Sequence, residues 1–373
     1  MWKFLVILPA LYLAGNAYIY WQGVVATRGL PPAVRVMLAV LFWLGALSFF
    51  GSFFLGRFVE LPEELARVFS RVGSGWLVFT LYMTLILLAF WLLKVVGVGF
   101  EYPFLWSLLL TVGLLGYGYY HYLHPIRQTI EVQVDKPLPG DKPVRIVAVS
   151  DIHLGYATDK EMLRHYVELI NAEYPDLVLI GGDLVDNNVK PLIDQRMEEE
   201  LCRIQAPMGV YMVPGNHEYI SGMEACARFI ERTPIVLLRD SVVTLPDGIR
   251  IAGRDDRSNH RRLPVERLLE SVDKRYPIIL LDHQPYDLDR AARAGADLQF
   301  SGHTHRGQVW PMSWVVDHLF ELSHGLKRIG ESTFYVSSGL SLWGPPFRIG
   351  TDSELVIFEL RGNSSVKAKA GGR

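Results

Sequence analysis

Apolar and polar positions divide the chain into two parts with different periodicity. In residues 1–123 long apolar stretches lack a polar face, whereas residues 124–373 alternate short apolar runs with polar segments. The four long stretches are Trp2–Tyr20, Ala33–Leu55, Trp76–Val96 and Pro103–Tyr122. Each is close to the ~20 residues that cross the hydrocarbon core of a bilayer, and soluble proteins seldom contain four such helices in a row. The pattern therefore predicts an all-α region of four transmembrane helices over residues 1–123.

The residues that flank these stretches indicate how the chain crosses the membrane. Aromatic side chains gather at the ends, as in membrane interfaces, and the repeated stretches argue against a cleaved signal peptide. An even number of spans places the N-terminus and the C-terminal part on the same side. That side carries Lys3, Arg57, Arg67, Arg71 and Arg127 near the spans, and the other side carries Arg28, Arg35 and Lys94. This slight excess predicts an integral membrane protein whose C-terminal part is cytoplasmic.

Residues 144–361 alternate β-branched runs with helical patterns. Val144–Val149 and Leu177–Ile180 have the composition of buried strands, and residues 159–173 between them have helical spacing with a capping Asp159. Residues 191–205 are expected to form a polar-faced helix. Later segments are richer in strands. The pattern predicts an α/β fold, or a layered α/β/β/α sandwich.

Two segments flank this alternating region. Residues 124–143 are rich in proline and are expected to form a linker, with a first strand at Thr129–Val134. Residues 362–373 are small, polar and basic, and we expect a disordered tail. The formal net charge of −2 supplies no basic field for nucleic acid, and two cysteines imply neither a disulfide framework nor a zinc site.

Five clusters of polar side chains begin where predicted strands end. They read DIH at 151–153, GDLVD at 182–186, GNHE at 215–218, a lone histidine at 283, and GHTH at 302–305. Ligand sites in open α/β sheets lie outside the carboxyl ends of the strands, so these clusters are expected to converge on one edge.

The clusters supply oxygen and nitrogen donors for two metal ions that share a bridging carboxylate. The donors are Asp151, His153, Asp183, Asn216, His283, His303 and His305. Mixed donors of this kind favour manganese, with iron or zinc as alternatives, over calcium. Two ions ~3.5–4 Å apart can clamp a phosphoryl group and hold a bridging hydroxide for in-line attack. Taken alone, His283 would be interpreted as a core or surface histidine, and only its position after a strand makes it a ligand candidate.

Three neighbouring side chains are expected to support the chemistry. His217 follows Asn216 and can serve the leaving oxygen, and Glu218 can orient its imidazole. Asp186 is expected to accept a hydrogen bond from a ligand imidazole or amide.

The motifs DIH, GGDLVD, GNHE, DH at 282–283 and GHTH, in this order, resemble the five blocks of the calcineurin-like metallophosphoesterase family. The resemblance covers residues 144–360 and, as a set, is highly specific. It implies a four-layer α/β/β/α metallophosphoesterase sandwich and a phosphoric ester hydrolase. It also implies that one metal binds Asp151, His153, Asp183 and His305, and that the other binds Asp183, Asn216, His283 and His303. His217 would then be the general acid or stabilise the transition state.

The apolar N-terminus and the sequences at 302–308 and 343–348 look like the bacterial transmembrane (YkuE-like) branch of this family. Many relatives carry glycine where Arg306 stands. Arg306 therefore either adds a cation that binds the substrate phosphate or points to solvent.

The substrate is expected to be a phosphorylated small molecule or a lipid. The bilayer anchor favours a phospholipid or a lipid-linked nucleotide, cut at a phosphate ester or pyrophosphate bond. The apolar stretch Trp310–Ile329 would be either a loop packed on its own core or a flap that enters the bilayer. Two alternatives stay open: a general phosphodiesterase for soluble substrates whose membrane region serves location only, and a non-catalytic scaffold or sensor on the same fold. The sequence gives no oligomeric state.

Overall fold

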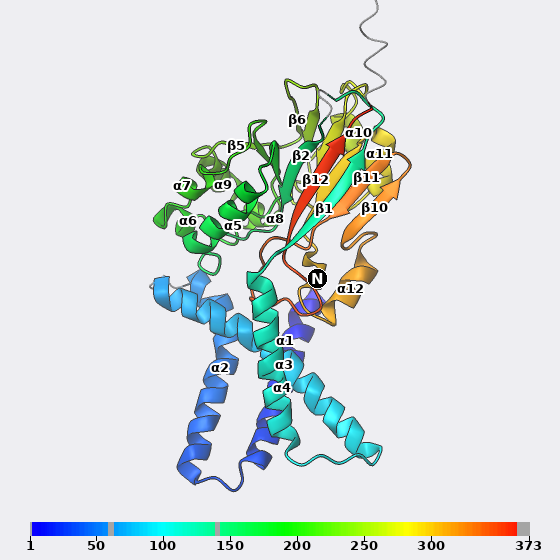
Figure 1. The fold of residues 1–373 in the computed structure, drawn as a ribbon. Coiled ribbons are helices and arrows are strands. Elements are labelled where there is room, and N and C mark those ends of the chain that lie inside the picture. The colour runs from blue at the N-terminus through cyan, green and yellow to red at the C-terminus, as the bar shows by residue number, and fades with distance from the viewer. Residues whose placement is uncertain (1, 59–62, 139–141, 364–373) are drawn as a thin grey trace, which may run out of the picture. The chain divides into compact units, whose positions relative to one another are not determined.

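The computed structural model describes residues 2–58, 63–138 and 142–363, which belong to two compact units (Figure 1). The helical unit comprises residues 1–121 and 344–349, and the α/β unit comprises residues 122–343 and 350–373. This division differs from the predicted boundaries in two ways. Residues 344–349 belong to the helical unit, and residues 124–143 belong to the α/β unit instead of forming a separate linker.

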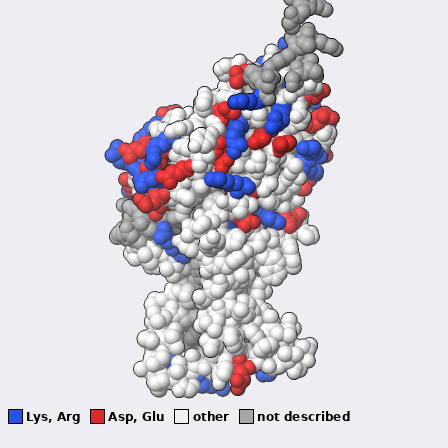
Figure 2. Space-filling view, viewed as in Figure 1, with Lys and Arg blue, Asp and Glu red and all other residues white. Residues whose placement is uncertain are grey.

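The helical unit contains a helix at each predicted span. These helices are α1 (Trp2–Ala26), α2 (Pro32–Phe58), α3 (Glu63–Val95) and α4 (Pro103–Leu123). Among the described residues, two segments are long and apolar enough to cross a membrane, Pro32–Gly51 and Arg71–Val95. On the face of these helices that Figure 2 shows, charged side chains are found mostly near the helix ends. Length and composition thus identify two candidate spans where the sequence pattern predicts four.

Small residues allow α2 and α3 to pack closely. A Cβ at Gly73 would lie 2.6 Å from the backbone oxygen of Ser48, and a Cβ at Gly45 would lie 2.2 Å from the ring of Trp76. Close crossings of this kind are typical of helices that pack in membranes. The fully buried Asn16 of α1 joins them, because its amide oxygen accepts the indole N–H of Trp76 at 2.9 Å.

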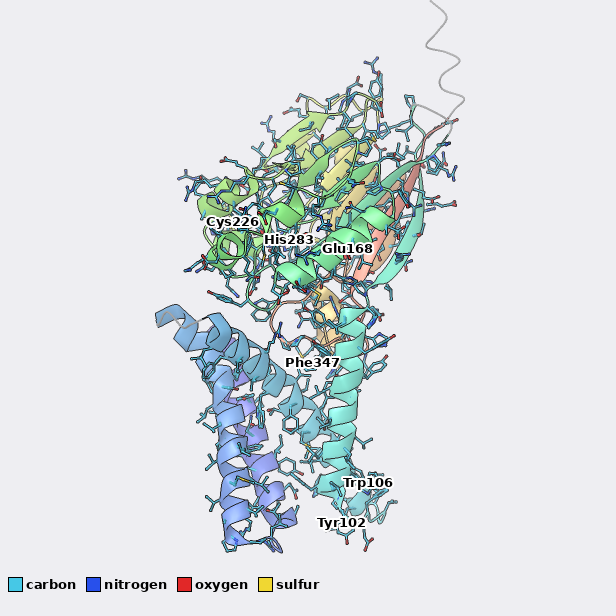
Figure 3. All side chains as sticks on the ribbon, turned by 60° about the vertical axis from the view of Figure 1, so that its left-hand side comes forward. Tyr102, Trp106, Glu168, Cys226, His283 and Phe347 are labelled. Carbon is cyan, nitrogen blue, oxygen red and sulfur yellow. The ribbon has the colours of Figure 1, made fainter. Side chains whose placement is uncertain are left out.

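Residues 344–349 complete the helical unit through contacts with α4. The backbone N–H of Arg348 donates to the carbonyl of Gly118 at 2.9 Å. A Cβ at Gly118 would lie 2.5 Å from the side chain of Ile349, so only glycine allows this approach. The ring of Phe347, labelled in Figure 3, lies 6.4 Å from that of Tyr119.

The α/β unit contains two six-stranded sheets. In spatial order, the first sheet consists of β1 (Ile126–Gln133), β12 (Glu354–Arg361), β2 (Val144–Val149), β3 (Leu177–Ile180), β4 (Val210–Met212) and β5 (Ile235–Leu237). The second consists of β10 (Gly325–Ile329), β11 (Ser332–Val336), β9 (Leu298–Ser301), β8 (Ile278–Leu281), β7 (Arg250–Gly253) and β6 (Ser241–Thr244). The run β2-β3-β4-β5 is parallel, as is the run β11-β9-β8-β7. The carboxyl ends within each run therefore lie at one edge.

Three apolar clusters separate four layers. Ile146 and Ala148 of β2 share a cluster with residues of β7, β8 and β9, so this cluster lies between the sheets. Val147 and Val149 of the same strand face the opposite way and pack with α5 (Lys160–Ala172) and α9 (Met223–Ile230). On the outer face of the second sheet lie α10 (Val265–Leu268) and α11 (Leu288–Ala294). Period-two alternation along buried strands thus builds the α/β/β/α order.

Some local patterns predict the wrong element. Residues 191–205, expected as one helix, form α6 (Lys190–Asp194) and α7 (Glu198–Leu201), because the chain at Arg196 takes a left-handed φ of 53°. By contrast, the strand predicted at Thr129–Val134 is confirmed as β1, which pairs in parallel with β12 along eight residues. Of the predicted tail, residues 364–373 lie outside the described residues.

Candidate metal centre

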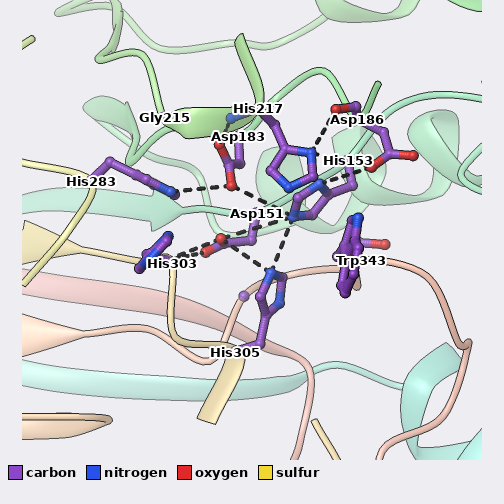
Figure 4. A network of polar contacts seen from close by, with 12 residues as sticks. Asp151, His153, Asp183, Asp186, Gly215, His217, His283, His303, His305 and Trp343 are labelled. Carbon is purple, nitrogen blue, oxygen red and sulfur yellow. Dashed lines mark hydrogen bonds and ion pairs between the residues drawn. The ribbon is translucent and has the colours of Figure 1, made fainter. Parts of the chain in front are cut away.

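The predicted ligands lie in the loops that directly follow five strands. Asp151 and His153 follow β2, Asp183 follows β3, and Asn216 begins α8 (Asn216–Ile220) after β4. From the second sheet, His283 follows β8, and the pair His303 and His305 follows β9. Figure 4 shows that these segments, far apart in the sequence, bring their side chains to one place.

Three overlapping groups of side chains have the spacing of metal ligands. Each group has its donor atoms within 4.8 Å of one another, and the groups are Asp151, His153 and His305; His153, Asp183 and His217; and Asp183, His283 and His303. Asp183 belongs to two of them and so occupies the place expected of a bridging carboxylate. All but His303 and His305 are buried, and those two are half-buried.

The nitrogen and oxygen atoms that face one another at this place are suited to bind cations. The Nε2 atoms of His153 and His305 lie 3.1 Å apart, and Nε2 of His283 lies 3.1 Å from a carboxylate oxygen of Asp183. The buried amide oxygen of Asn216 accepts no hydrogen bond within the described residues. Buried polar atoms are normally paired, so an unpaired amide oxygen beside these carboxylates and imidazoles fits a site built for metal ions. The residues present therefore fit a dinuclear centre.

Two glycines allow the backbone to approach the carboxylates. A Cβ at Gly215 would lie 2.1 Å from Oδ1 of Asp183, and a Cβ at Gly302 would lie 2.2 Å from Oδ2 of Asp151. The following N–H groups then bind these oxygens: His217 N–H donates to Asp183 at 2.8 Å, and His303 N–H donates to Asp151 at 3.0 Å. The glycines of the GNHE and GHTH motifs thus position the carboxylates.

Most of the predicted ligands have a left-handed backbone. The φ angles are 55° at Asp151, 50° at His153, 53° at Asp183, 73° at His303 and 48° at His305. This region is uncommon for residues other than glycine, and such conformations cluster at functional sites. It turns the donors toward one another directly after the strands.

Burial and neighbouring charges shift the pKa of several groups at the centre. Burial raises the pKa of Asp151. For Asp183, burial acts in the same direction, but the charge and hydrogen bond of His283 outweigh it and the pKa is lowered. Burial, together with the charge of His283, lowers the pKa of His303 to about 4. An imidazole must be neutral to bind a metal, so the lowered pKa of His303 suits a ligand.

His217 and Asp186 lie beside these ligands. The Nδ1–H of His217 donates to the backbone carbonyl of Asp186 at 2.6 Å, which leaves Nε2 as the atom that can serve a substrate. A carboxylate oxygen of Asp186 lies 3.4 Å from Nδ1 of both His153 and His217. Burial would lower the pKa of His217, but the hydrogen bond to Asp186 and the charge of Asp183 raise it to about 9. His217 can therefore carry a proton at neutral pH.

Glu218 has a different role from the one predicted. Its buried carboxylate accepts the backbone N–H groups of Asp183 at 3.0 Å, Val185 at 2.9 Å and Gly215 at 2.7 Å. It therefore joins the loops after β3 and β4, while Asp186 orients the His217 ring. Burial and the charge of Asp183 raise the pKa of Glu218 to about 7.

Arg306 lies directly after His305 in the short helix η1 (His305–Gly307) and is half-buried. Within the described residues its guanidinium forms no hydrogen bond or ion pair with another side chain. The side chain is thus available to a substrate anion, and both interpretations of Arg306 remain.

Sequence reasoning missed two features near the ligands. The indole of Trp343 lies 6.2 Å from the His217 ring, whereas the sequence at 343–348 was not expected to reach the metal centre. The buried Asp282 beside His283 binds Arg254 at 2.6 Å and Arg262 at 3.0 Å. A charged residue at the end of the apolar run 278–281 is the signal that could have identified Asp282.

The chain is similar to known metallophosphoesterases. Residues 144–307 match the family model described as calcineurin-like phosphoesterase. A metallophosphoesterase of Helicobacter pylori (strain J99) is 34% identical over 259 residues, which are 67% of this chain and 68% of that protein. One from Aquifex aeolicus (strain VF5) is 31% identical over 252 residues, covering 66% and 94% of the two chains. A "transmembrane protein with metallophosphoesterase domain" of Danio rerio is 31% identical over 272 residues, covering 68% and 62%. The chain belongs to the calcineurin-like metallophosphoesterase family.

Proposed function

We propose that this chain is a membrane-anchored phosphoesterase with a dinuclear metal centre, which hydrolyses a phosphate ester or pyrophosphate bond. The observation that carries the proposal is the chain of three overlapping ligand groups, in which His153 links the first two and Asp183 links the last two, at the carboxyl ends of strands from both sheets. Membership of the metallophosphoesterase family supports the same reaction class.

The position of each residue suggests its role in the proposed reaction. Asp151, His153 and His305 would hold one ion, Asn216, His283 and His303 the other, and Asp183 would contact both. When bound, a divalent pair supplies Lewis acidity and activated water for in-line attack on phosphorus. His217, held by Asp186, is placed to protonate the leaving oxygen through Nε2 or to stabilise its charge. Arg306 offers a cation to the phosphate oxygens.

We propose manganese as the native metal, with iron or zinc as alternatives, because the donors mix carboxylate, amide and imidazole. Metal analysis of the purified protein should find about two equivalents in the wild type. Asp183→Ala should retain less than half of this content, since it removes the donor shared by both ions. Equal metal content in the two proteins would contradict a bridging role.

We further propose that four helices cross the membrane and that the α/β unit is cytoplasmic. The proposal rests on the basic residues near the spans, on the two apolar segments of α2 and α3, and on similarity to a relative described as a transmembrane protein.

The region after His305 supports a lipid or lipid-linked nucleotide as the substrate. Its first part forms α12 (Met312–Leu319), in which only Ser313 is buried, whereas Leu322 and Ile329 of its second part pack on the core beside the second sheet. The exposed fractions are 59% for Trp314 and 68% for Leu319. Phe320, which ends the helix, lies 5.9 Å from the ring of His303. An exposed apolar helix that ends beside a ligand could hold acyl chains near the metals.

The test compares a lipid extract with a soluble chromogenic phosphodiester, both with manganese present. Wild type should release phosphorylated products from the lipids, and Asp183→Ala should not; identical products would remove the enzymatic proposal and favour a scaffold. Trp314→Ser and Leu319→Ser should lower hydrolysis of the lipid and spare the soluble ester. Tyr174→Ser, which removes an aromatic side chain 85% exposed elsewhere on the α/β unit, is the matched control. Equal rates on lipid in all three variants would favour a phosphodiesterase for soluble substrates.

A further inference from the structure

A second polar cavity lies beside the ligand loop of β8. Its volume is about 260 Å³, and four arginines line it together with one carboxylate: Arg254, Arg257, Arg262, Arg290 and Asp287. A water molecule in the liquid takes roughly 30 Å³, so the space is large enough for a phosphate group with several waters. Its polar lining suits an anion and not an acyl chain.

The inner wall of the cavity carries an excess of positive charge. The side chains of Arg254 and Arg262 are only 7% and 10% exposed, and both bind the same carboxylate, Asp282. The Nε–H of Arg254 has no hydrogen-bond partner within the described residues. Buried charges are normally paired, so two guanidiniums on one carboxylate leave one charge for a ligand.

Two neighbouring carboxylates hydrogen-bond other groups and not these guanidiniums. Asp255 is bound to Arg239 at 3.2 Å and to the hydroxyl of Tyr219 at 2.6 Å. Asp256 accepts a hydrogen bond from Gln284 at 2.9 Å.

The two arginines of the outer wall, Arg290 and Arg257, differ in how their charges are paired. Arg290 donates two hydrogen bonds to Glu266, at 2.7 and 2.9 Å, so its charge is satisfied. Arg257 forms a long ion pair with Asp287, at 3.8 Å, and stacks over the ring of Tyr286 at 4.2 Å. Among the described residues its guanidinium is held by the ring and donates no hydrogen bond to a carboxylate, an arrangement that suits bidentate binding of an oxyanion.

Ring contacts connect this wall to the metal centre. Tyr286, under Arg257, lies 5.2 Å from Phe320, and Phe320 lies 5.9 Å from His303. On the inner side, Asp282 directly precedes the ligand His283 in the chain. The cavity is therefore within reach of one extended substrate molecule whose other end is at the metals.

We propose that this cavity binds a second phosphate group of the substrate, one that is not hydrolysed. The inference rests on the proposed phosphoesterase function and adds the substrate class: a phosphoester that carries two separated phosphates. Arg254, Arg262 and Arg257 bind the second phosphate, and the metal centre receives the first.

The first experiment measures the cavity without catalysis. Chelator-treated full-length protein in detergent is dialysed against radiolabelled inorganic phosphate. Saturable binding should weaken about tenfold in Arg257→Ala, as expected for loss of a charged hydrogen bond. It should tighten in Asp287→Asn, which removes the competing carboxylate and keeps a side chain that tolerates the left-handed φ of 59° at this position. Arg267→Ala, on α10 outside the cavity, should bind like wild type. No saturable binding, or equal affinity in all four proteins, would overturn the proposal.

The second experiment separates this inference from the proposed function. With manganese, wild type and Arg257→Ala are compared on p-nitrophenyl phosphate and on an alkanediol bisphosphate. Arg257→Ala should raise KM about tenfold for the bisphosphate alone and leave kcat unchanged for both. If wild type hydrolyses both substrates and Arg257→Ala changes KM for neither, the cavity has no role in substrate binding. The proposed phosphoesterase function is then still supported. If wild type hydrolyses neither, the proposed function fails, and the dialysis result alone decides whether the cavity binds phosphate.

Discussion

The imidazole of His217 is fixed at Nδ1 by the carbonyl of Asp186, which leaves Nε2 as the nitrogen that could act in the proposed reaction. We predict that His217→Asn lowers kcat about 10²- to 10⁴-fold for an ester with an alkoxide leaving group, the usual range for a lost general acid. The loss in kcat should be much smaller for a p-nitrophenyl ester, because p-nitrophenolate leaves without being protonated. The measurement is kcat for both esters, with metal content as the control. A uniform loss across leaving groups would exclude proton donation by His217.

At this scale, sequence spacing identified side chains that the structure brings close together: six of the seven proposed donors, all but Asn216, belong to the three ligand groups, because each lies after a strand in a parallel run. It failed for Glu218 for a local reason. Since α8 begins at Asn216, Glu218 stands at its third position and reaches back to the N–H of Gly215, as in a capping box. The pairing of Asp282 with Arg254 could not be predicted, because only the register of β7 on β8 brings these residues together.

At the scale of elements, strand existence was predictable where both faces are buried, as in β2 and β3, whose bounds agree with the prediction. β1 was predicted as a strand, but its place in the first sheet was not, because its partner, β12, lies at the other end of the chain. Residues 191–205 show the reverse failure: helical composition is continuous there, but the backbone turns at Arg196.

The link between β12 and the second sheet predicts a pH effect on stability. Glu354 of β12, 1% exposed, accepts hydrogen bonds from Tyr335 at 3.0 Å, from the N–H of Ser338 at 2.7 Å and from His324 at 3.2 Å. Burial would raise its pKa, but the bonds from His324 and Ser338 outweigh it and the pKa is lowered. Because a lowered carboxyl pKa stabilises the ionised native state, this contribution is present above the unfolded value of 4.5 and is lost as pH falls through the folded value.

Glu354→Gln should therefore destabilise the protein by about 2 kcal/mol at pH 7. The difference in Tm from wild type should shrink as the pH falls below the unfolded pKa. Thermal melts of the detergent-solubilised protein at a series of pH values measure both quantities. A difference in Tm that is constant across the series would show that the carboxylate charge is not the stabilising feature.

The crossing of α2 and α3 predicts a steric effect. A Cβ at Gly73 meets the backbone of Ser48, which cannot rotate away, so Gly73→Ala should lower the Tm of the detergent-solubilised protein by several degrees. Gly113→Ala in α4 is the matched control, since a Cβ there meets nothing within 4 Å. A Tm loss of the same size in both variants would indicate a general cost in these helices and not a packing contact.

For the whole molecule, labelling can separate four membrane spans from two. With four spans, the loop between α3 and α4 lies outside and the α/β unit inside; with α2 and α3 alone as spans, both lie on the same side. Gly99→Cys places a thiol in that loop where no atom crowds it. In a variant that also carries Cys202→Ser, an impermeant maleimide should label the thiol introduced at position 99 in intact cells. In the protein without these substitutions, the exposed Cys202 should react with the maleimide only after the cells are permeabilised. Labelling of both thiols under the same condition would reject the four-span topology.

The return of residues 344–349 to the helical unit has a consequence for biosynthesis. The ribosome makes α1 to α4 first, but the segment that packs on Gly118 and Tyr119 emerges only after nearly the whole α/β unit has been synthesised. Domains usually complete their folding in the order of translation. Here the nascent helices must wait for the α/β unit to emerge before their last packing partner arrives. The part of the protein that is translated first therefore completes its packing only near the end of synthesis, shortly before β12 emerges and completes the first sheet of the α/β unit.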